Sequence, residues 1–382
     1  MVISLVLYSA IAVITVLAAY KVRQYDMSDQ RGRFCDRIYL FGIFAVLFIF
    51  SAIRFGVGND YKQYVQTAHE ASIGGYVVTE AGFNWLVRIV YTLCGGEYYE
   101  VVFALFAGVT LFIFLKALYE QSEDFFQSFF LFMMFGLYFQ TYNTVRYYLA
   151  LSVALYSMRY VLNRDYIKFV FWIVVAAFFH KSVLIVIPVY LLAAFTWKRW
   201  QIILGLAFSV ACFLGKSLVL KLALILYPSY ENTIFLEGGT SVVSILRGLA
   251  VLGLYVWYVF KYGHINGQNK KKQKESIDND FNNGTLEFYA KLNLLSVIVG
   301  VFFSFLPVIT RIVYYFSISQ LLLIPAIISR IPDEKTRKIV KYIVAVCCII
   351  YFIIFLMTAG QPGVGLIPYR SWLFEEERYI VK

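Results

Sequence analysis

Apolar runs of about 20 residues alternate with short polar connections along nearly the whole chain. A bilayer core of roughly 30 Å needs about 20 apolar residues per helix, so the pattern predicts an all-α, polytopic bundle of transmembrane helices. The twelve predicted spans are 2–20, 38–55, 99–119, 125–142, 144–162, 166–180, 182–197, 200–215, 241–260, 286–306, 311–330 and 339–359.

Two parts of the pattern depart from simple crossings. Segment 56–98 is the longest stretch between spans, and its apolar piece 82–95 is too short to cross comfortably, so we expect it to lie in the interface or to dip in and return. The stretches on either side of His180 are each only about 15 residues long. Their shared turn is therefore expected to lie below the outer surface, in a cavity.

Composition supports one integral membrane domain over residues 1–382. Hydrophobic residues make up 61% of the chain and charged residues only 15%, and no polar block is large enough to fold separately in water. The net charge of +11 comes from short clusters between apolar runs, which indicates membrane topology rather than nucleic-acid binding. The five cysteines show neither a disulfide framework nor zinc-ligand spacing.

The positive charges predict the orientation. Alternate connections carry 22 of the 34 Lys and Arg residues, and these connections should be cytoplasmic. They include a basic inner loop at 261–284. Both termini are then outside, with an outer tail at 360–382. No basic residue precedes the first span, which therefore reads as a retained helix rather than a cleaved signal.

Polar residues gather at the outer ends of the spans. A single arginine near a helix end is more often an interface anchor than a ligand, but here separate turns place cations or a histidine at the same depth, together with acids and amides. This convergence predicts an outward-facing site. Its members are Arg54, Asp60, Glu80, Gln140, Asn143, Arg146, His180, Lys181 and Arg311.

The residue types indicate an anionic ligand and a base. Arginine forks fit phosphate oxygens in pairs. Desolvation and the neighbouring Lys181 would both favour a neutral His180 imidazole that can accept a proton, although this histidine could instead tie two helices together. The outer tyrosines could stack on sugar rings or fill interfacial positions; they are Tyr61, Tyr64, Tyr314 and Tyr315. The chain lacks a phosphate-binding loop, an H-E-x-x-H pair and a conspicuous D-x-D, which disfavours nucleotide and metal-dependent enzymes.

The order of these motifs resembles the EpsG-type family of bacterial exopolysaccharide polymerases, relatives of the Wzy polymerases. The most specific element is Arg54-Phe-Gly-Val-Gly-Asn-Asp60-Tyr61. It is joined by Tyr64, Glu80 before Gly82-Phe83, Asn143 with Arg146, the FFHKS run with His180 and Ser182, and Pro368-Tyr369. One departure is visible: the family usually has Gln after the arginine of N-x-x-R, whereas Tyr147 stands here.

The resemblance implies an inverting polymerase without metal or cofactor, with a fold similar to the GT-C lipid-linked glycosyltransferases. Such an enzyme joins repeat units carried on undecaprenyl pyrophosphate at the outer face of the cytoplasmic membrane. The growing glycan leaves its lipid pyrophosphate for a hydroxyl at the non-reducing end of the incoming unit. The expected partners are the lipid-linked oligosaccharide, the bilayer, a chain-length regulator and a flippase.

On this reading the charged residues divide into two roles. Diphosphate binding is assigned to Arg146 and Arg311, with Arg54 and Lys181. His180 is the first choice of base, with Asp60 or Glu80 as the alternative, and Asn143 and the outer tyrosines would contact glycan. Two rival functions stay open: an O-acyltransferase acting on polysaccharide, and a transporter or flippase for the lipid-linked glycan.

Overall fold

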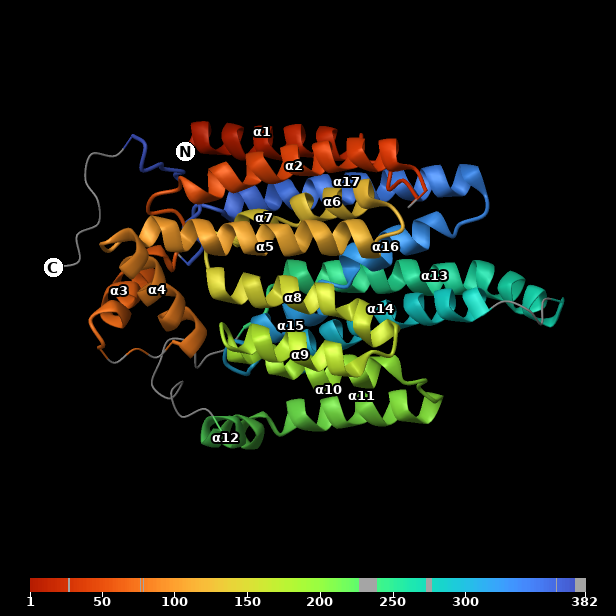
Figure 1. The fold of residues 1–382 in the computed structure, drawn as a ribbon. Helices are drawn as coiled ribbons and strands as arrows, with labels where there is room; N and C mark the ends of the chain where they lie inside the picture. The colour runs from red at the N-terminus through yellow and green to blue at the C-terminus, as the bar shows by residue number, and fades with distance from the viewer. Residues whose placement is uncertain are drawn as a thin grey trace. The chain divides into compact units, whose positions relative to one another are not determined.

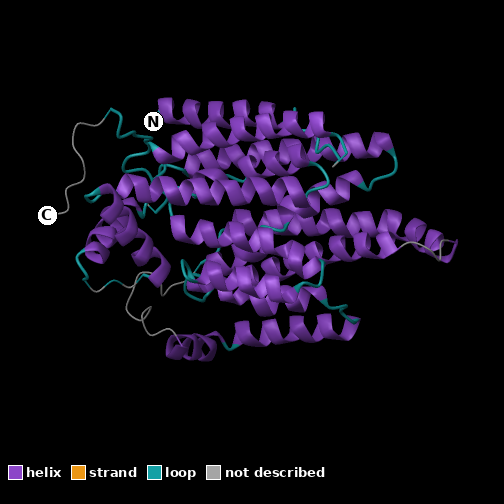
Figure 2. Ribbon diagram, viewed as in Figure 1, coloured by secondary structure: helices purple, strands orange, loops and turns teal. Residues whose placement is uncertain are grey.

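The computed structural model describes residues 1–26, 28–75, 77, 79–226, 239–272, 277–361 and 363–374. These residues form helices joined by loops and turns, and no strand occurs among them (Figures 1 and 2). The chain divides into two compact units. Unit 1 comprises 1–156, 174–181 and 332–382, and unit 2 comprises 157–173 and 182–331.

Unit 1 is built on long helices at the two ends of the sequence. Helix α2 packs against α1 and α5, while α6 packs against α1 and α17. A shorter pair, α3 and α4, comes from the predicted outer segment. The helices are α1 (Val2–Ala19), α2 (Gln30–Ala52), α3 (Tyr61–Ser72), α4 (Ala81–Cys94), α5 (Tyr99–Gln121), α6 (Phe125–Met134), α7 (Leu137–Gln140) and α17 (Glu334–Thr358).

Two helices pass from one unit to the other along the chain: α8 (Val145–Leu162) and α9 (Tyr166–Ala177). In unit 2, α14 is the central element, since it packs against α10, α11, α13, α15 and α16. The remaining helices are η1 (Lys181–Ile185), α10 (Val186–Ala194), α11 (Arg199–Leu214), α12 (Lys216–Leu226), α13 (Val242–Lys272), α14 (Ile277–Phe302), α15 (Ile309–Ser317) and α16 (Gln320–Ser329).

Seven helical stretches in the described residues are long and apolar enough to cross a membrane. They are Val2–Ala19, Gln30–Ala52, Tyr99–Gln121, Val242–Tyr262, Gly284–Phe302, Ile309–Ser329 and Glu334–Thr358. The pair α11 and α12, bent by 87°, would make an eighth. Each of the twelve predicted segments overlaps a helix, but the helices within 125–142, 166–180 and 182–197 are short. The count of twelve crossings therefore stays a prediction.

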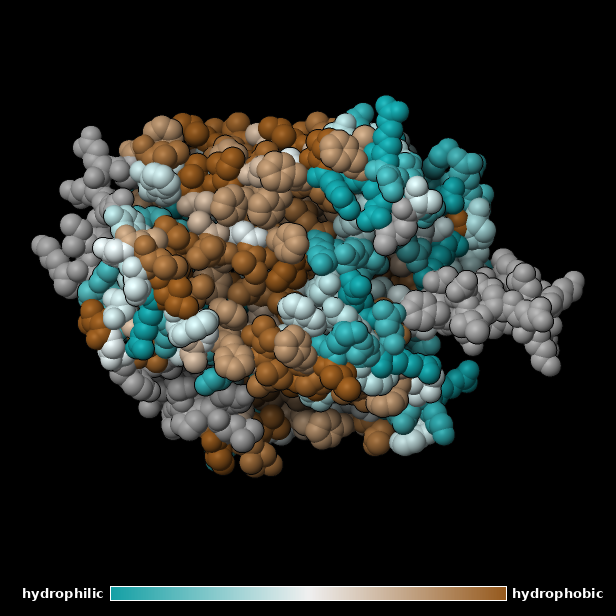
Figure 3. All heavy atoms as spheres, in the orientation of Figure 1, coloured by the Kyte–Doolittle hydropathy of each residue, from teal (hydrophilic) through white to brown (hydrophobic). Residues whose placement is uncertain are grey.

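The outer surfaces of the long helices are apolar. On α1, Ile3 is 84% exposed, and on α2 Phe41 is 71% exposed. Figure 3 shows hydrophobic side chains covering the parts of α1, α2 and α5 that face the viewer. Contiguous apolar surface of this kind is stable against lipid and not against water. The chain is therefore a membrane protein.

Aspartates cap three helices at one end of unit 1. Asp29, Asp124 and Asp333 each accept a hydrogen bond from a backbone N–H in the first turn, at α2, α6 and α17 respectively. Such caps satisfy N–H groups that have no partner within the helix. The same helix beginnings carry basic residues, among them Arg33, Arg37 and Lys338. The positive charge predicted for one membrane side thus gathers at one end of this unit.

The opposite end of unit 1 holds the start of α1 and the last described residues together. The Tyr8 hydroxyl donates to the Leu366 carbonyl at 2.5 Å, and the Tyr369 N–H donates to Ser4 Oγ at 2.9 Å. The same C-terminal segment pairs with the connection after α2, where the Phe55 N–H donates to the Arg370 carbonyl at 2.9 Å. Both described ends of the chain thus lie at the end of unit 1 opposite the basic helix starts.

The connection between α2 and α3 depends on Gly58. Its φ is +105°, and a Cβ built on it would lie 2.5 Å from the Tyr142 carbonyl oxygen. Its N–H donates to Gly365 at 2.9 Å, and the next N–H, from Asn59, donates to Asn143 Oδ1 at 2.8 Å. A side chain at position 58 would therefore push this connection away from the turn before α8.

Gly58→Ala should lower the thermal unfolding temperature of the detergent-purified protein, because the backbone conformation costs about 1–3 kcal/mol and the Tyr142 carbonyl blocks the Cβ. Gly74→Ala is the matched control, since Gly74 also has positive φ, +78°, but has nothing within 4 Å of its Cβ position. Equal losses in the two variants would contradict the close approach at Gly58.

Candidate active site

Three separate segments of unit 1 meet at the carboxylate of Glu80. Glu80 directly precedes α4, Arg146 lies in the first turn of α8, and His180 and Lys181 follow α9. Arg146 Nη1 donates to Glu80 Oε2 in a short ion pair. The Lys181 backbone N–H donates to Oε1 at 3.0 Å, and His180 Nδ1 lies 3.5 Å from the same oxygen.

Aromatic rings surround the two charged partners. The Arg146 guanidinium lies over the rings of Tyr64 and Phe83, 5.4 Å from each centroid, and its Nε donates to the Tyr64 hydroxyl at 3.4 Å. The Tyr147 ring meets the His180 imidazole edge to face at 5.5 Å. Side-chain exposure is 16% for Arg146, 13% for Glu80 and 9% for His180, and both ring nitrogens of His180 are buried, so this cluster is shielded from solvent.

A glycine lets the start of α4 approach the end of α9. The Gly82 N–H donates to the Phe178 carbonyl at 2.9 Å, and a Cβ at position 82 would lie 2.6 Å from that oxygen. The chain after α9 turns tightly, since the N–H groups of Phe179 and His180 both donate to the Ala176 carbonyl. This contact between backbones places Glu80 beside His180, although 100 residues separate them in sequence.

Glu80 is held ionised by its partners. Burial alone would raise the pKa of its carboxyl, but the neighbouring His180 imidazole, the charge of Arg146 and the Lys181 N–H outweigh burial and lower the pKa to about 2. The carboxylate therefore stays negative at any pH near neutrality and accepts protons poorly.

Asp60 and Asn143 lie at the turn that leads into α8. The Thr144 hydroxyl donates to Asp60 Oδ2 at 3.2 Å, and Asn143 accepts from the Asn59 N–H. Asp60 is half-buried at the start of α3. These two predicted residues thus fix the connection between α2 and α3 against the helix that carries Arg146.

Arg54 is inside unit 1 rather than on a ligand-facing surface. It is 2% exposed, its guanidinium lies 5.1 Å from the centroids of the Phe103 and Tyr142 rings, and Nη1 donates to the Ser51 carbonyl at 2.5 Å. The aromatic faces compensate the buried charge. This geometry gives Arg54 no open side for a diphosphate.

Three of the four predicted sugar-stacking tyrosines are buried. Tyr61 and Tyr64 belong to the core formed by α3, α4 and α5. Tyr315, in unit 2, is fully buried, with its hydroxyl 3.1 Å from Ser182 Oγ and its carbonyl accepting from the Tyr190 hydroxyl. None of these rings presents a face to a sugar in this conformation.

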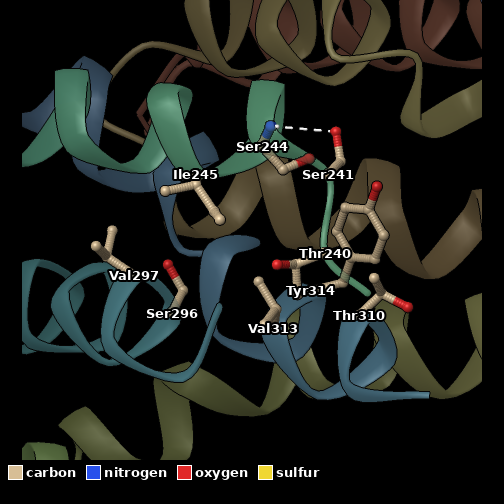
Figure 4. Close-up of a pocket in the computed structure, with 9 residues that line it drawn as sticks. All are labelled: Thr240, Ser241, Ser244, Ile245, Ser296, Val297, Thr310, Val313 and Tyr314. Atoms are coloured by element: carbon tan, nitrogen blue, oxygen red, sulfur yellow. Dashed lines mark hydrogen bonds between the residues drawn. The ribbon is translucent and has the colours of Figure 1, made fainter. Parts of the chain in front are cut away.

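Tyr314 instead lines a small cavity of about 20 Å³ in unit 2, whose wall is mostly apolar (Figure 4). Thr240, Ser241, Ser244, Ser296 and Thr310 contribute hydroxyl groups from the residues before α13, from α13, from α14 and from α15. This volume holds about one water. Arg311 is half-buried on the same helix as Tyr314. That Arg311 meets the Glu80 cluster stays a prediction.

The sequence did not predict which residues Glu80 pairs with. Its pairing with both Arg146 and His180 was not foreseen, and the family position next to Arg146, here Tyr147, proves to contact the histidine. Gly82, two residues after Glu80, could have indicated that another segment packs closely there, because glycine in an element often marks the close approach of another backbone. In the described residues, no group of three His, Cys, Asp or Glu side chains could hold a metal ion.

Comparison with known proteins gives one result. A model of the EpsG family matches residues 37–371, whereas no curated protein and no solved structure matches the chain. The matched range includes the whole Glu80 cluster and every predicted site residue. The chain therefore belongs to the EpsG family, and it is a membrane enzyme of exopolysaccharide polymerisation.

Proposed function

We propose that this enzyme polymerises oligosaccharide repeat units linked to undecaprenyl pyrophosphate at the outer face of the bacterial cytoplasmic membrane. The observation that carries the proposal is the meeting of a guanidinium and an imidazole at the Glu80 carboxylate, because it puts an anion-binding group beside a base. In the reaction the acceptor hydroxyl attacks the anomeric carbon, the bond to the lipid diphosphate breaks, and the configuration inverts.

Arg146 is the first candidate to bind the diphosphate. Glu80 and Tyr64 fix the orientation of its guanidinium, so its remaining donors are preorganised for the charge that grows on the leaving group. The exposed Lys181 ammonium is the second cation, and the assignment of Arg311, which belongs to unit 2, stays a prediction from the sequence. For Arg54, deep burial favours a supporting role in which it holds the connection between α2 and α3.

His180 is the preferred base. With Nδ1 facing the Glu80 carboxylate, the neutral imidazole carries its proton on that nitrogen and offers Nε2 to the acceptor hydroxyl. Glu80 then stabilises the imidazolium that forms, as an acid does behind a catalytic histidine. The low pKa of Glu80 makes it a poor base itself. Asp60 stays the alternative, and Asn143 and Tyr314 are the proposed glycan contacts.

The membrane arrangement is part of the proposal. We propose a single GT-C-like domain with about twelve crossings, in which α8 and the short helices α6, α9 and α10 complete the spans that the seven long stretches and the bent pair leave out. The basic helix starts of unit 1 would be cytoplasmic, and both termini and the Glu80 cluster outside. Such a protein would act beside a flippase and a chain-length regulator, and it would need no metal or cofactor.

One assay separates this function from its rivals. Purified protein incubated with a lipid-linked repeat unit should produce a ladder of lengthened lipid-linked glycans on a gel. An acyltransferase or a flippase would leave the glycan length unchanged. Absence of a ladder from protein that remains folded would contradict the proposal.

Arg146→Lys should lower the polymerisation rate by about 100-fold although the charge is kept, because the ammonium cannot reproduce the fork that joins Glu80 and the diphosphate. Initial rates on the same lipid-linked substrate would measure the loss. Arg370→Lys is the control, since Arg370 is exposed and only its backbone carbonyl is used in the fold. Similar rates for both variants would count against diphosphate binding by Arg146.

His180→Ala should slow polymerisation by about 10²–10⁴-fold, the usual contribution of a general base. His69→Ala is the matched control, because His69 is partly exposed and paired with Glu97 rather than with the cluster. Normal polymer length in cells expressing His180→Ala, or a full rate from the purified variant, would show that another group takes the proton.

Glu80→Gln should reduce thermal stability at pH 7, and the difference from the unmodified protein should shrink as the pH falls from about 4.5 toward about 2. The sign follows from the lowered pKa of Glu80: its stabilising effect is complete above the ordinary value of 4.5 and is lost as the folded carboxyl protonates near 2. Unfolding temperatures in detergent at several pH values would measure it. A difference that does not change with pH would exclude the ion pair as its cause.

A further inference from the structure

A groove of about 620 Å³ runs along unit 1 between α4 and the end of α9. Its lining includes Gly82, Trp85, Arg88, Val175, Phe178 and Phe179. Trp85 is 70% exposed and Phe178 58% exposed, so two of the aromatic side chains of the groove are open to a ligand. The volume falls within the range of roughly 300–1,000 Å³ that is typical of ligand sites.

The chemistry of the lining favours an apolar ligand. Most of the lining side chains are aromatic or aliphatic. Asn84 also lines the groove, but its amide is already used by Thr79, whose hydroxyl donates to Oδ1 and whose carbonyl accepts from Nδ2. Arg88 is anchored by its Nε, which donates to the Ala71 carbonyl at 2.8 Å. A glycan would need several polar partners, and this groove offers few.

The groove lies next to the Glu80 cluster along the chain. Ala81 and Gly82 follow Glu80, Phe178 and Phe179 precede His180, and the backbone contact between Gly82 and Phe178 holds these two segments together. The Glu80 cluster beside the groove carries two cationic side chains, Arg146 and Lys181, together with the carboxylate of Glu80, which suits an anion at the end of an apolar chain.

We propose that this groove binds the first isoprene units of the polyprenyl chain of the lipid-linked substrate and so positions its diphosphate against the Glu80 cluster. The inference rests on the proposed function, because that function supplies a ligand with a long apolar chain that carries a diphosphate at one end. Trp85 and Phe178 contact the isoprene units, and Arg88 lies beside the chain near the surface.

Binding of undecaprenyl pyrophosphate without any sugar tests the groove independently of catalysis. Native mass spectrometry of the detergent-purified protein would measure the apparent Kd. The double variant Trp85→Ala, Phe178→Ala should weaken binding by about tenfold, since each removes apolar contact area. Leu93→Ala is the matched control: Leu93 lies on the same helix α4, is 81% exposed and is outside the groove lining. Because all three side chains are exposed, we expect the variants to fold, and gel filtration would check this.

A chain-length comparison gives a second readout. The unmodified enzyme should have a KM about tenfold lower for a repeat unit on undecaprenyl pyrophosphate than on a short prenyl pyrophosphate, and the double variant should lose most of that preference. Equal Kd values for the double variant and Leu93→Ala would overturn the inference. Displacement of the prenyl ligand by the same concentration of phosphatidylglycerol would also overturn it, since the groove would then hold ordinary membrane lipid.

The outcomes distinguish this inference from the proposed function. Binding that depends on Trp85 and Phe178, with no polymer ladder from the unmodified protein, would support the groove and contradict polymerisation. A ladder formed equally well by the double variant at low substrate concentration would support polymerisation and contradict the groove.

Discussion

The buried negative charge of Glu80 is the constraint on which the candidate site depends. An ionised carboxylate in a shielded position is costly unless cations and N–H donors surround it. Here the donors come from the first turn of α8 and from the segment after α9, so the same charge that must be compensated also fixes the positions of Arg146 and His180. One residue thus sets the distance between the proposed diphosphate-binding group and the proposed base.

The scaffold around this carboxylate uses glycine where backbones must meet. Gly82 allows α4 to begin against the end of α9, and Gly58 allows the connection after α2 to lie against the turn before α8. The backbone of the C-terminal segment also hydrogen-bonds to the connection after α2. Arg54 lies beneath these contacts with its charge against aromatic rings. Its place among the sequence motifs is therefore explained by packing at this end of unit 1.

The proposed substrate has three chemically different parts, and the residues of this chain divide in the same way. The groove beside Trp85 is apolar and suits an isoprenoid chain. Arg146 and Lys181 suit the diphosphate, and the imidazole of His180 suits the acceptor hydroxyl. The rival functions account less well for this division, since an acyl donor needs no diphosphate-binding group of this kind and transport of the lipid-linked glycan needs no base.

The sequence by itself determined the helical membrane fold. Apolar runs of sufficient length must form helices in lipid, where every backbone group needs an internal partner, and each predicted segment does overlap a helix. The sequence also placed Glu80, Arg146 and His180 in one predicted outer set, because polar residues are costly within such runs.

Tertiary structure alone decided which of those residues meet. Periodicity and hydropathy do not say which helix faces pack, so they could not separate Arg54, buried among rings, from Arg146, which faces Glu80. For the same reason Tyr61 and Tyr64 were expected to contact glycan and are core residues instead. The pairing of Glu80 with Arg146 joins positions 66 residues apart, and only the packing of α4 against α9 and α8 brings them within reach.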